Sequence, residues 1–190
     1  RLEIDEHHHH KDVYTHTLTV LEQAIDLETG PDGPVPGPDF VLRFAALMHD
    51  IGKPDTRRYE DGGVVTFRFH EVVGARMTTK RMKALKFDKD TTKAVARLVE
   101  LHLRFHGYAD SGWTDSAVRR YVTDAGPQLE RLHRLTRADC TTRNKRKARN
   151  LREAYDDLER RIAELAEQEE LDKIRPELDG KQIMQILDIG

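Results

Sequence analysis

An all-α fold is predicted, because each long segment of this chain has apolar residues at helical spacing and only one short segment has the pattern of a β-hairpin. The 190 residues are 37% hydrophobic and 35% charged, with a formal net charge of -2. This balance is typical of a globular chain with one core and a helical appendage. The chain has no overall excess of basic residues that would by itself indicate nucleic-acid binding.

The first predicted helix covers residues 13–27. Its larger apolar residues follow spacings of four, three and four, so we expect them to face the core, with His16 beside them. These residues are Tyr14, Leu18, Leu21 and Ile25. Residues 30–38 contain four of the seven prolines and three glycines, which predicts a surface loop.

Asp39 is expected to cap a second helix over residues 40–51. This helix is apolar nearly all round, so we expect it to be buried, with His49 and Asp50 emerging at its C-terminal end. A buried aspartate without a partner is costly, and a cation beside it removes that cost.

A short hairpin is predicted where residues 56–60 and 64–69 flank Asp61-Gly62-Gly63, and it is the only β element expected. The helix that follows, over residues 70–85, has apolar residues at helical spacing. The residues expected to face inward are Val73, Met77 and Ala84.

Three further helices complete the first part of the chain. One covers residues 91–106 and has a single apolar face. Thr114 caps the next, which runs to residue 121, and Pro127 opens the helix that carries Asp139. The apolar face of the 91–106 helix consists of Val95, Leu98, Val99, His102 and Phe105.

A long final helix is predicted from about residue 143. Its apolar residues alternate spacings of three and four over a short span, which favours packing within the molecule over pairing with a second subunit. After Pro176, Asp179 and Gln182 resemble a capping box on a last short helix. The seam of the long helix consists of Ala148, Leu151, Tyr155, Leu158, Ile162 and Leu165.

Four candidate metal ligands come from three of these helices. His16 precedes His49 by 33 residues, and Asp139 follows Asp50 by 89 residues. Histidine and carboxylate ligands from separate helices can hold a divalent cation, which indicates metal-dependent phosphate chemistry. Such mixed ligands admit one or two ions of Mg, Mn, Fe, Ni, Co or Zn. The alternative is a buried polar network without a metal.

The order His, His-Asp, Asp resembles the ligand signature of the HD superfamily of metal-dependent phosphohydrolases, which have an all-helical fold. Longer strings resemble the C-terminal part of bacterial CCA-adding tRNA nucleotidyltransferases of the poly(A) polymerase-like family, over nearly the whole chain. These strings are 12–24 (DVYTHTLTVLEQA), 46–57 (ALMHDIGKPDTR), 67–76 (FRFHEVVGAR), 114–122 (TDSAVRRYV) and 176–186 (PELDGKQIMQI).

The resemblance implies an N-terminal flank over residues 1–10, an HD-type helical bundle over 11–142 and a helical arm, similar to a tRNA-binding body, over 143–190. The catalytic head of those enzymes, a glycine-serine loop followed by a strand with paired acids, is not in this chain. Asp88 and Asp90 offer paired acids, but no Gly-Ser precedes them, so we expect a helix-capping loop there.

The resemblance also implies a second metal. HD proteins with two metals have two more histidines between the HD pair and the last aspartate, and His70 and His102 stand in that interval. Asp50 would then bridge the two ions, with His70 and His102 completing the second site. The alternative is one metal and two hydrogen-bonded histidines.

Further polar residues near these ligands are candidates for catalysis or substrate binding. Lys53 could place its ammonium over a phosphoryl oxygen, or it could be a solvated loop lysine. Glu71 could relay a proton, or it could be an acid that favours the helix dipole. His106 is a candidate phosphate or ligand contact, or a surface histidine, whereas His133 is expected to be structural or exposed.

A basic block begins directly after the Asp139 helix. It places six positive charges and no negative ones within ten residues. Such a block can follow a phosphate backbone, so tRNA is the expected partner, while a solvated cationic face is the alternative. The block consists of Arg143, Lys145, Arg146, Lys147, Arg149 and Arg152.

The sequence also bears on the cellular compartment of the protein and on whether the chain is part of a longer polypeptide. Cys140 is the single cysteine, which excludes a disulfide framework and favours a reducing cytoplasm, with the thiol as a small core residue. No segment predicts a signal peptide or a membrane span. The chain begins with Arg1, so we expect a piece of a longer polypeptide, and we expect the histidines at 7–10 to be native.

Two classes of function follow. The first is an enzyme in which one or two divalent ions activate a water that attacks a phosphomonoester or a cyclic phosphodiester. The resemblance implies 2',3'-cyclic phosphates or nucleotides as substrates. The second is a non-catalytic tRNA-binding body that supports a nucleotidyltransferase head.

Overall fold

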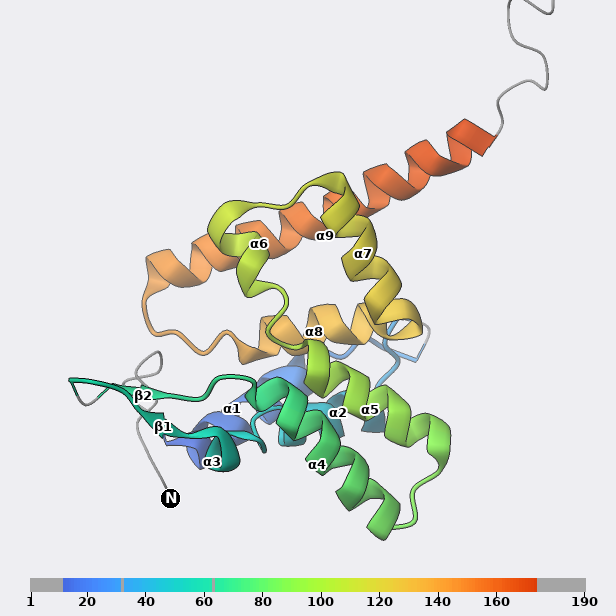
Figure 1. Ribbon diagram of the computed structural model, residues 1–190. Helices are drawn as coiled ribbons and strands as arrows, with labels where there is room; N and C mark the ends of the chain where they lie inside the picture. The colour runs from blue at the N-terminus through green and yellow to red at the C-terminus, as the bar shows by residue number, and fades with distance from the viewer. Residues whose placement is uncertain (1–11, 32, 63, 174–190) are drawn as a thin grey trace, which may run out of the picture.

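Helices make up nearly all of the regular structure, which confirms the all-α prediction (Figure 1). The computed structural model describes residues 12–31, 33–62 and 64–173. Its helices are α1 (Val13–Asp26), α2 (Phe40–Met48), α3 (Lys53–Thr56), α4 (His70–Ala84), α5 (Lys89–Leu101), α6 (His106–Ser111), α7 (Asp115–Ala125), α8 (Leu129–Asp139) and α9 (Lys145–Lys173), with the 3-10 turn η2 (Gly126–Gln128) before α8.

The predicted hairpin is present but shorter than expected. Strands β1 (Arg58–Tyr59) and β2 (Val65–Thr66) pair antiparallel, with Arg58 opposite Thr66. The first expected strand loses its beginning to α3, because Pro54 in the first turn is well suited to a helix start. Thr29 and Pro36 also form an isolated β-bridge across the proline-rich loop. This bridge was not predicted, because the hairpin was the only β element expected.

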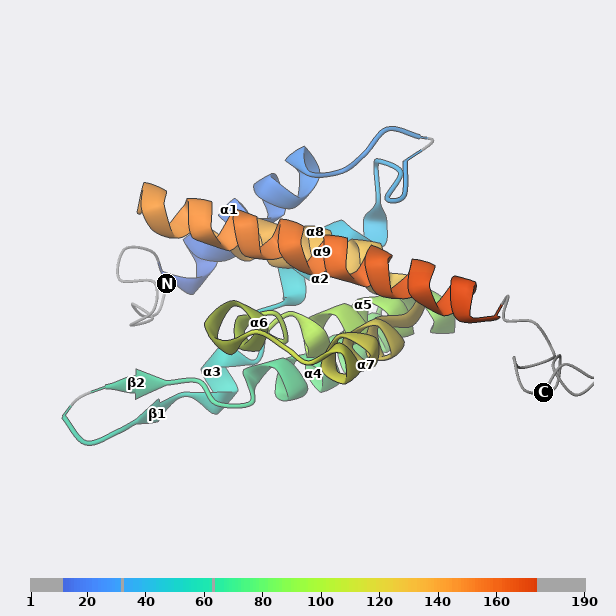
Figure 2. The same cartoon turned by 90° about the horizontal axis from the view of Figure 1, so that it is seen from above.

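The helices lie in two layers joined by α8. Helices α1, α2, α4 and α5 form one layer, and α6, α7 and α9 lie on the other side of α8 (Figure 1). Buried residues run through both layers, so the core is continuous from Leu42 in α2, through Leu132 in α8, to Leu158 in α9. From above, α9 crosses over the first layer and extends past it (Figure 2).

The buried face of α1 differs from the prediction. Tyr14 is 64% exposed, and Leu18 and Ile25 are also exposed, while Leu21 packs against the core only in part. The face that packs on α2 and α8 carries His16, Val20 and Ala24 instead. Smaller side chains allow the helices to approach closely, so tertiary packing outweighs the larger apolar stripe.

The same effect changes α4. Its buried face consists of His70, Gly74, Thr78 and Met82, whereas the predicted Ala84 is exposed and Val73 and Met77 are only half-buried. In α2, which was expected to be buried all round, Phe40 and Leu47 remain exposed. The Phe40 ring lies on the outside of a stack with Phe44 and Phe87, with ring centroids 5.2 Å apart.

Helix ends follow the predicted caps more closely than helix lengths follow the predicted ranges. Asp39, Asp88 and Thr114 each accept a hydrogen bond from a backbone N–H in the first turn of the helix they cap. Asp88 is therefore a capping residue, as predicted. Helix α5 ends at Leu101, five residues earlier than expected, although the five residues of its predicted apolar face are all buried.

The long final helix packs within the molecule, as predicted. Tyr155 and Leu158 are buried, and Leu151, Ile162 and Leu165 pack against the same core. The histidines at 7–10 and the short helix predicted after Pro176, with Asp179 and Gln182, lie outside the described residues. The boundaries predicted at 10 and 142 stay predictions. Among the helices that the structure describes, none is both long and apolar enough to cross a membrane.

Candidate metal centre

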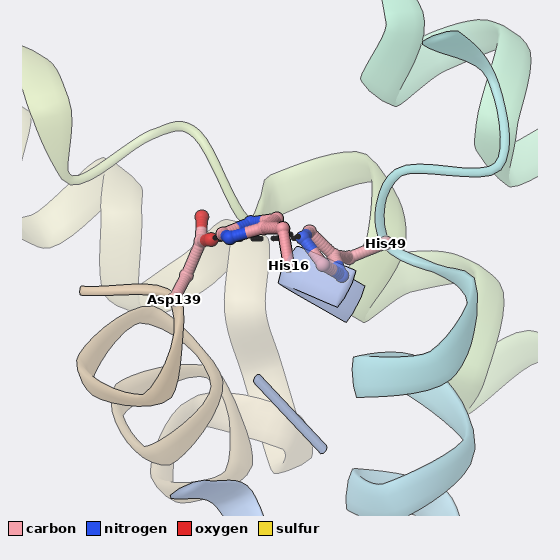
Figure 3. Close-up of side chains that lie close together, drawn as sticks. All are labelled: His16, His49 and Asp139. Carbon is pink, nitrogen blue, oxygen red and sulfur yellow. Dashed lines mark hydrogen bonds and ion pairs between the residues drawn. The ribbon is translucent and has the colours of Figure 1, made fainter. Parts of the chain in front are cut away.

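Three helix segments bring the first group of candidate ligands together. His16 projects from the buried face of α1, His49 caps the C-terminal end of α2, and Asp139 is the last residue of α8 (Figure 3). His16 Nε2 lies 2.9 Å from Asp139 Oδ1 and 3.3 Å from His49 Nε2. One ligand atom from each residue fits within a 4.8 Å span, so the group could hold a metal ion.

A second group lies beside the first and contains Asp50, His70 and His102. Asp50 Oδ1 is 3.3 Å from His70 Nε2 and 4.0 Å from His102 Nε2. All three residues are buried, and their ligand atoms also fit within a 4.8 Å span. The structure thus places both histidines, from α4 and from the end of α5, at the HD pair.

Asp50 stands between the two groups. Its Oδ2 lies 3.2 Å from His49 Nε2 and 3.6 Å from His16 Nε2, while its Oδ1 faces the second group. One oxygen directed to each group is the arrangement of a carboxylate that bridges two metal ions. The two-ion arrangement and the alternative of one ion with two hydrogen-bonded histidines both stay predictions.

The local backbone sets the orientation of three histidine rings. In each, Nδ1 lies at hydrogen-bond distance from the carbonyl oxygen of the residue three positions earlier. Because a carbonyl only accepts, Nδ1 of each ring carries a proton, and Nε2 is the nitrogen that faces the centre. These contacts are His49 to Ala46 at 2.8 Å, His70 to Phe67 at 2.8 Å and His102 to Val99 at 2.6 Å.

His16 is held by a side chain instead. Its Nδ1 lies 3.3 Å from the hydroxyl oxygen of Thr141, which follows α8. Sequence reasoning missed Thr141. The only signal for it was a hydroxyl residue two positions after the candidate ligand Asp139, and such a position does not by itself indicate a contact with a residue 125 positions away.

A backbone contact sets the spacing between the two groups. A Cβ atom at Gly52 would lie 2.2 Å from the carbonyl oxygen of His70 and 2.8 Å from the backbone nitrogen of Gly74. Only glycine permits this approach. The chain after the HD pair can therefore lie directly against the start of α4, where His70 projects toward Asp50.

Burial and mutual charge perturb the ionisable groups of the centre. Burial opposes the charge of His49, but the Asp50 and Asp139 carboxylates raise its pKa to about 9. Burial, strengthened by the charge of His49, lowers the pKa of His102 to about 3. Burial also opposes ionisation of Asp50 and Asp139, yet the neighbouring histidines hold the pKa of each carboxyl below its usual range.

Several ligand atoms are buried without completing a hydrogen bond, and this tests whether a cation fits. They would remain costly in a purely polar network, because buried polar atoms are normally paired. A divalent cation would satisfy them together. They are His70 Nε2, His102 Nε2, Asp50 Oδ2 and Asp139 Oδ1, and the two carboxylate oxygens lie 2.9 Å from Lys53 Nζ and from His16 Nε2, respectively.

Lys53 belongs to the same centre. It is 5% exposed, and its Nζ lies 2.9 Å from Asp50 Oδ2 and 5.6 Å from the centroid of the Phe67 ring. The alternative of a solvated loop lysine is therefore wrong. Helix α3 causes the difference, since its first residue is Lys53 and the helix turns this side chain back toward the HD pair.

The remaining candidates lie nearer the surface. Glu71 is half-buried in the first turn of α4, and its buried Oε2 completes no hydrogen bond. His106 is exposed at the start of α6, outside both ligand groups. His133 is buried with its ring stacked on Tyr121, which confirms a structural position. Cys140 is half-buried and packs against the core, as predicted.

The predicted basic block is exposed. Its residues lie in the connection after α8 and in the first two turns of α9. Arg149 makes a long ion pair of 3.8 Å with Glu153, with both side chains largely exposed. The members of the block are Arg143, Lys145, Arg146, Lys147, Arg149 and Arg152.

Comparison with known proteins identifies the family. Residues 13–189 match the family model described as HD domain, so the chain belongs to the HD domain family. HD domains bind divalent metals, and the two groups of histidine and aspartate side chains could hold such ions.

Similar curated proteins are named as tRNA nucleotidyltransferases or as multifunctional CCA proteins. The chain is 35% identical over 182 residues to an A-adding tRNA nucleotidyltransferase of Deinococcus radiodurans, covering 94% of this chain and 39% of the relative. It is 38% identical over 97 residues to a CC-adding tRNA nucleotidyltransferase of Thermus thermophilus, covering 50% of this chain and 20% of the relative. A multifunctional CCA protein of Actinobacillus pleuropneumoniae is 30% identical over 107 residues, 56% of this chain and 24% of that protein. The chain thus spans at most about two fifths of the length of these relatives.

Proposed function

We propose that this HD domain is a metal-dependent phosphohydrolase of the phosphatase or 2',3'-cyclic phosphodiesterase type. The observation that carries the proposal is the position of Asp50, whose two oxygens face two separate groups of buried histidine and aspartate ligands. A purely structural network would not leave the Nε2 atoms of His70 and His102 buried without hydrogen bonds.

The six candidate ligands would bind two ions. His16, His49 and Asp139 would hold one ion, His70 and His102 the other, and Asp50 both. When bound, the ions supply water activation and stabilisation of charge on the phosphoryl group. The rings would stay fixed when an ion binds, because each Nδ1 is already engaged.

Lys53 and Glu71 are the proposed acid–base and charge partners. The buried ammonium of Lys53 would donate to a phosphoryl oxygen placed beside Asp50 Oδ2, in a site where water does not weaken the interaction. Glu71 would accept a proton through its unpaired Oε2. His106, exposed at the start of α6, is a proposed contact for the part of the substrate away from the reacting phosphate.

The substrate class is a phosphate ester or a nucleotide, including 2',3'-cyclic phosphates. Mixed histidine and carboxylate ligands admit Mg, Mn, Fe, Ni, Co or Zn. The proposal is tested by hydrolysis of p-nitrophenyl phosphate and of 2',3'-cyclic AMP across these metals. Asp50→Ala should lower metal-stimulated turnover by orders of magnitude, because it removes the shared ligand.

Asp90→Ala is the matched control. It removes an exposed carboxylate from the first turn of α5 and should leave hydrolysis unchanged. Hydrolysis that is absent with every metal, or that is equal in wild type and Asp50→Ala, would reject the phosphohydrolase proposal.

A second candidate is a non-catalytic tRNA-binding body that supports a nucleotidyltransferase head in a longer protein. The similarity to the A-adding enzyme over 94% of the chain favours it, as does the exposure of the basic block. In a longer protein with such a head, nucleotide addition should persist in Asp50→Ala. Substitution of Arg146, Lys147 and Arg149 by alanine should weaken tRNA binding and reduce its salt dependence.

A further inference from the structure

The outer side of α4 carries cations that the fold does not neutralise. Between Glu71 and Asp88 the sequence has five positive residues and no acid. All five are exposed, and none forms an ion pair with a described carboxylate. They are Arg76, Lys80, Arg81, Lys83 and Lys86.

This pattern differs from the rest of the described surface, where guanidinium groups are commonly paired with carboxylates. Favourable interaction of cations with the C-terminal end of a helix accounts for Arg81, Lys83 and Lys86. It does not account for Arg76 and Lys80, which lie further from that end. Paired arginines elsewhere are Arg43, Arg97, Arg104, Arg119, Arg131, Arg137, Arg160 and Arg161.

Three of the cations share one side of the helix. Arg76, Lys80 and Lys83 follow spacings of four and three and form what we call the α4 stripe. The buried residues of α4 occupy the opposite side, so the stripe faces away from the core. At 1.5 Å of rise per residue, it extends for about 10 Å.

An exposed aromatic residue directly precedes α4. Phe69 is 70% exposed and adopts a left-handed backbone conformation, with φ 64 and ψ 20. This turn lets the Phe67 carbonyl oxygen accept from the backbone N–H and the ring Nδ1–H of His70. Glycine would serve the turn without strain, whereas a bulky residue costs about 1–3 kcal/mol.

The Phe69 ring contributes nothing to the packing that could offset this cost. No described aromatic ring stacks on it, and most of its surface is open. Exposed aromatic rings next to cations are the means by which proteins bind single-stranded nucleic acid, with bases on the rings and phosphates on the cations. An acidic protein would not require a ring at this position, and binding to an anionic membrane is an outcome that the test below separates.

We propose that Phe69 and the α4 stripe bind a single-stranded polynucleotide, with a base against Phe69 and the phosphates of the strand along Arg76, Lys80 and Lys83. Phe69 directly precedes His70, so a strand bound in this way has one end at the candidate metal centre. The binding surface stands on its own, and only the orientation of the strand rests on the proposed function.

The test measures binding of a fluorescein-labelled oligouridylate to the full chain by anisotropy, in EDTA, so that hydrolysis does not enter. Lys80→Ala/Lys83→Ala should weaken binding and lower the slope of log affinity against log salt by about 1.4, since each lost contact with a single strand contributes about 0.7. The matched control is Lys93→Ala/Arg120→Ala, which removes two exposed cations from other helices and should leave affinity and slope unchanged.

Phe69 is tested separately. Phe69→Leu should weaken binding about tenfold, because an aliphatic side chain cannot stack on a base, and Phe69→Tyr should retain it. A parallel titration with an oligothymidylate distinguishes RNA from DNA, and binding of either strand with this dependence supports the proposal.

Equal affinity of wild type, the stripe variant and its control for both strands would overturn the proposal. So would stripe-dependent binding to phosphatidylserine vesicles with no binding to either strand. Hydrolysis of p-nitrophenyl phosphate by Lys80→Ala/Lys83→Ala should match wild type. Failure of the phosphohydrolase proposal therefore appears in that assay and leaves the binding result unaffected.

Discussion

A buried aspartate lies at each end of α2, and the partners of the two carboxylates differ. At the N-terminal end, Asp39 accepts a hydrogen bond from the backbone N–H of Leu42 and a bidentate contact from Arg131, with Nε 3.1 Å from Oδ1 and Nη2 2.8 Å from Oδ2. At the C-terminal end, Asp50 faces histidine Nε2 atoms, and the Nζ of Lys53 lies 2.9 Å from its Oδ2. Both side chains are nearly inaccessible, with exposed fractions of 6% and 3%.

The difference separates a structural acid from a candidate functional one. Arginine is always charged and forks around a carboxylate, so Asp39 has no capacity left for another cation. The side chains around Asp50 are instead histidines whose Nε2 atoms are possible metal ligands, so this region is a candidate site for cations. Burial alone would not have distinguished them.

The largest expected effect is at the metal centre. Asp139→Ala removes a ligand only from the first group, and His102→Ala only from the second. Each should lower hydrolysis more than a hundredfold and reduce the bound metal, measured by elemental analysis, from two ions to one. A wild-type content of one ion, unchanged by His102→Ala, would favour the single-metal alternative.

A substitution at the N-terminal end of α2 should lower the stability of the fold. Asp39→Ala removes the cap and leaves Arg131 without its carboxylate, so the free energy of unfolding should fall by about 3 kcal/mol. Urea denaturation of the metal-free protein measures this. Asp50→Ala/Lys53→Met in the same experiment should cost much less, because it removes the acid together with the buried ammonium 2.9 Å from it and strands neither charge. Equal losses for the two variants would contradict the distinction between the two ends.

Lys53 should affect turnover more than folding. Lys53→Met keeps the apolar stem beside Phe67 but removes the ammonium 2.9 Å from Asp50. The expected loss in kcat is about a hundredfold, as for other single donors to a transition state. A change in KM alone, with kcat retained, would make Lys53 a binding residue only.

The smallest effect is expected at Thr141. Thr141→Val keeps the shape of the side chain but removes the oxygen that holds His16 Nδ1. Metal affinity, measured by competition with a chelating dye, should weaken about tenfold. Thr141→Ser should restore it. Unchanged affinity in the valine variant would show that His16 is oriented by packing alone.

The sequence predicted most helices and their caps, because hydrophobic spacing and capping residues are local. It predicted the wrong faces of α1 and α4, since Ala24, Gly74 and Thr78 are buried by close packing rather than by their own hydrophobicity. The six candidate ligands were also predicted, His70 and His102 only through a family resemblance. The contacts of the His49, His70 and His102 rings with backbone carbonyls were not predicted, and neither was the burial of Lys53. Both depend on where each helix begins or ends.

The contact between Gly52 and the start of α4 has a dimensional consequence. No side chain separates the two backbones, so the distance from the HD pair to His70 is fixed by the van der Waals radii of main-chain atoms. A single added methyl group at position 52 would act as a spacer that opens the centre while leaving every ligand in the sequence. The spacing between the two groups of candidate ligands thus depends on the absence of a side chain at Gly52.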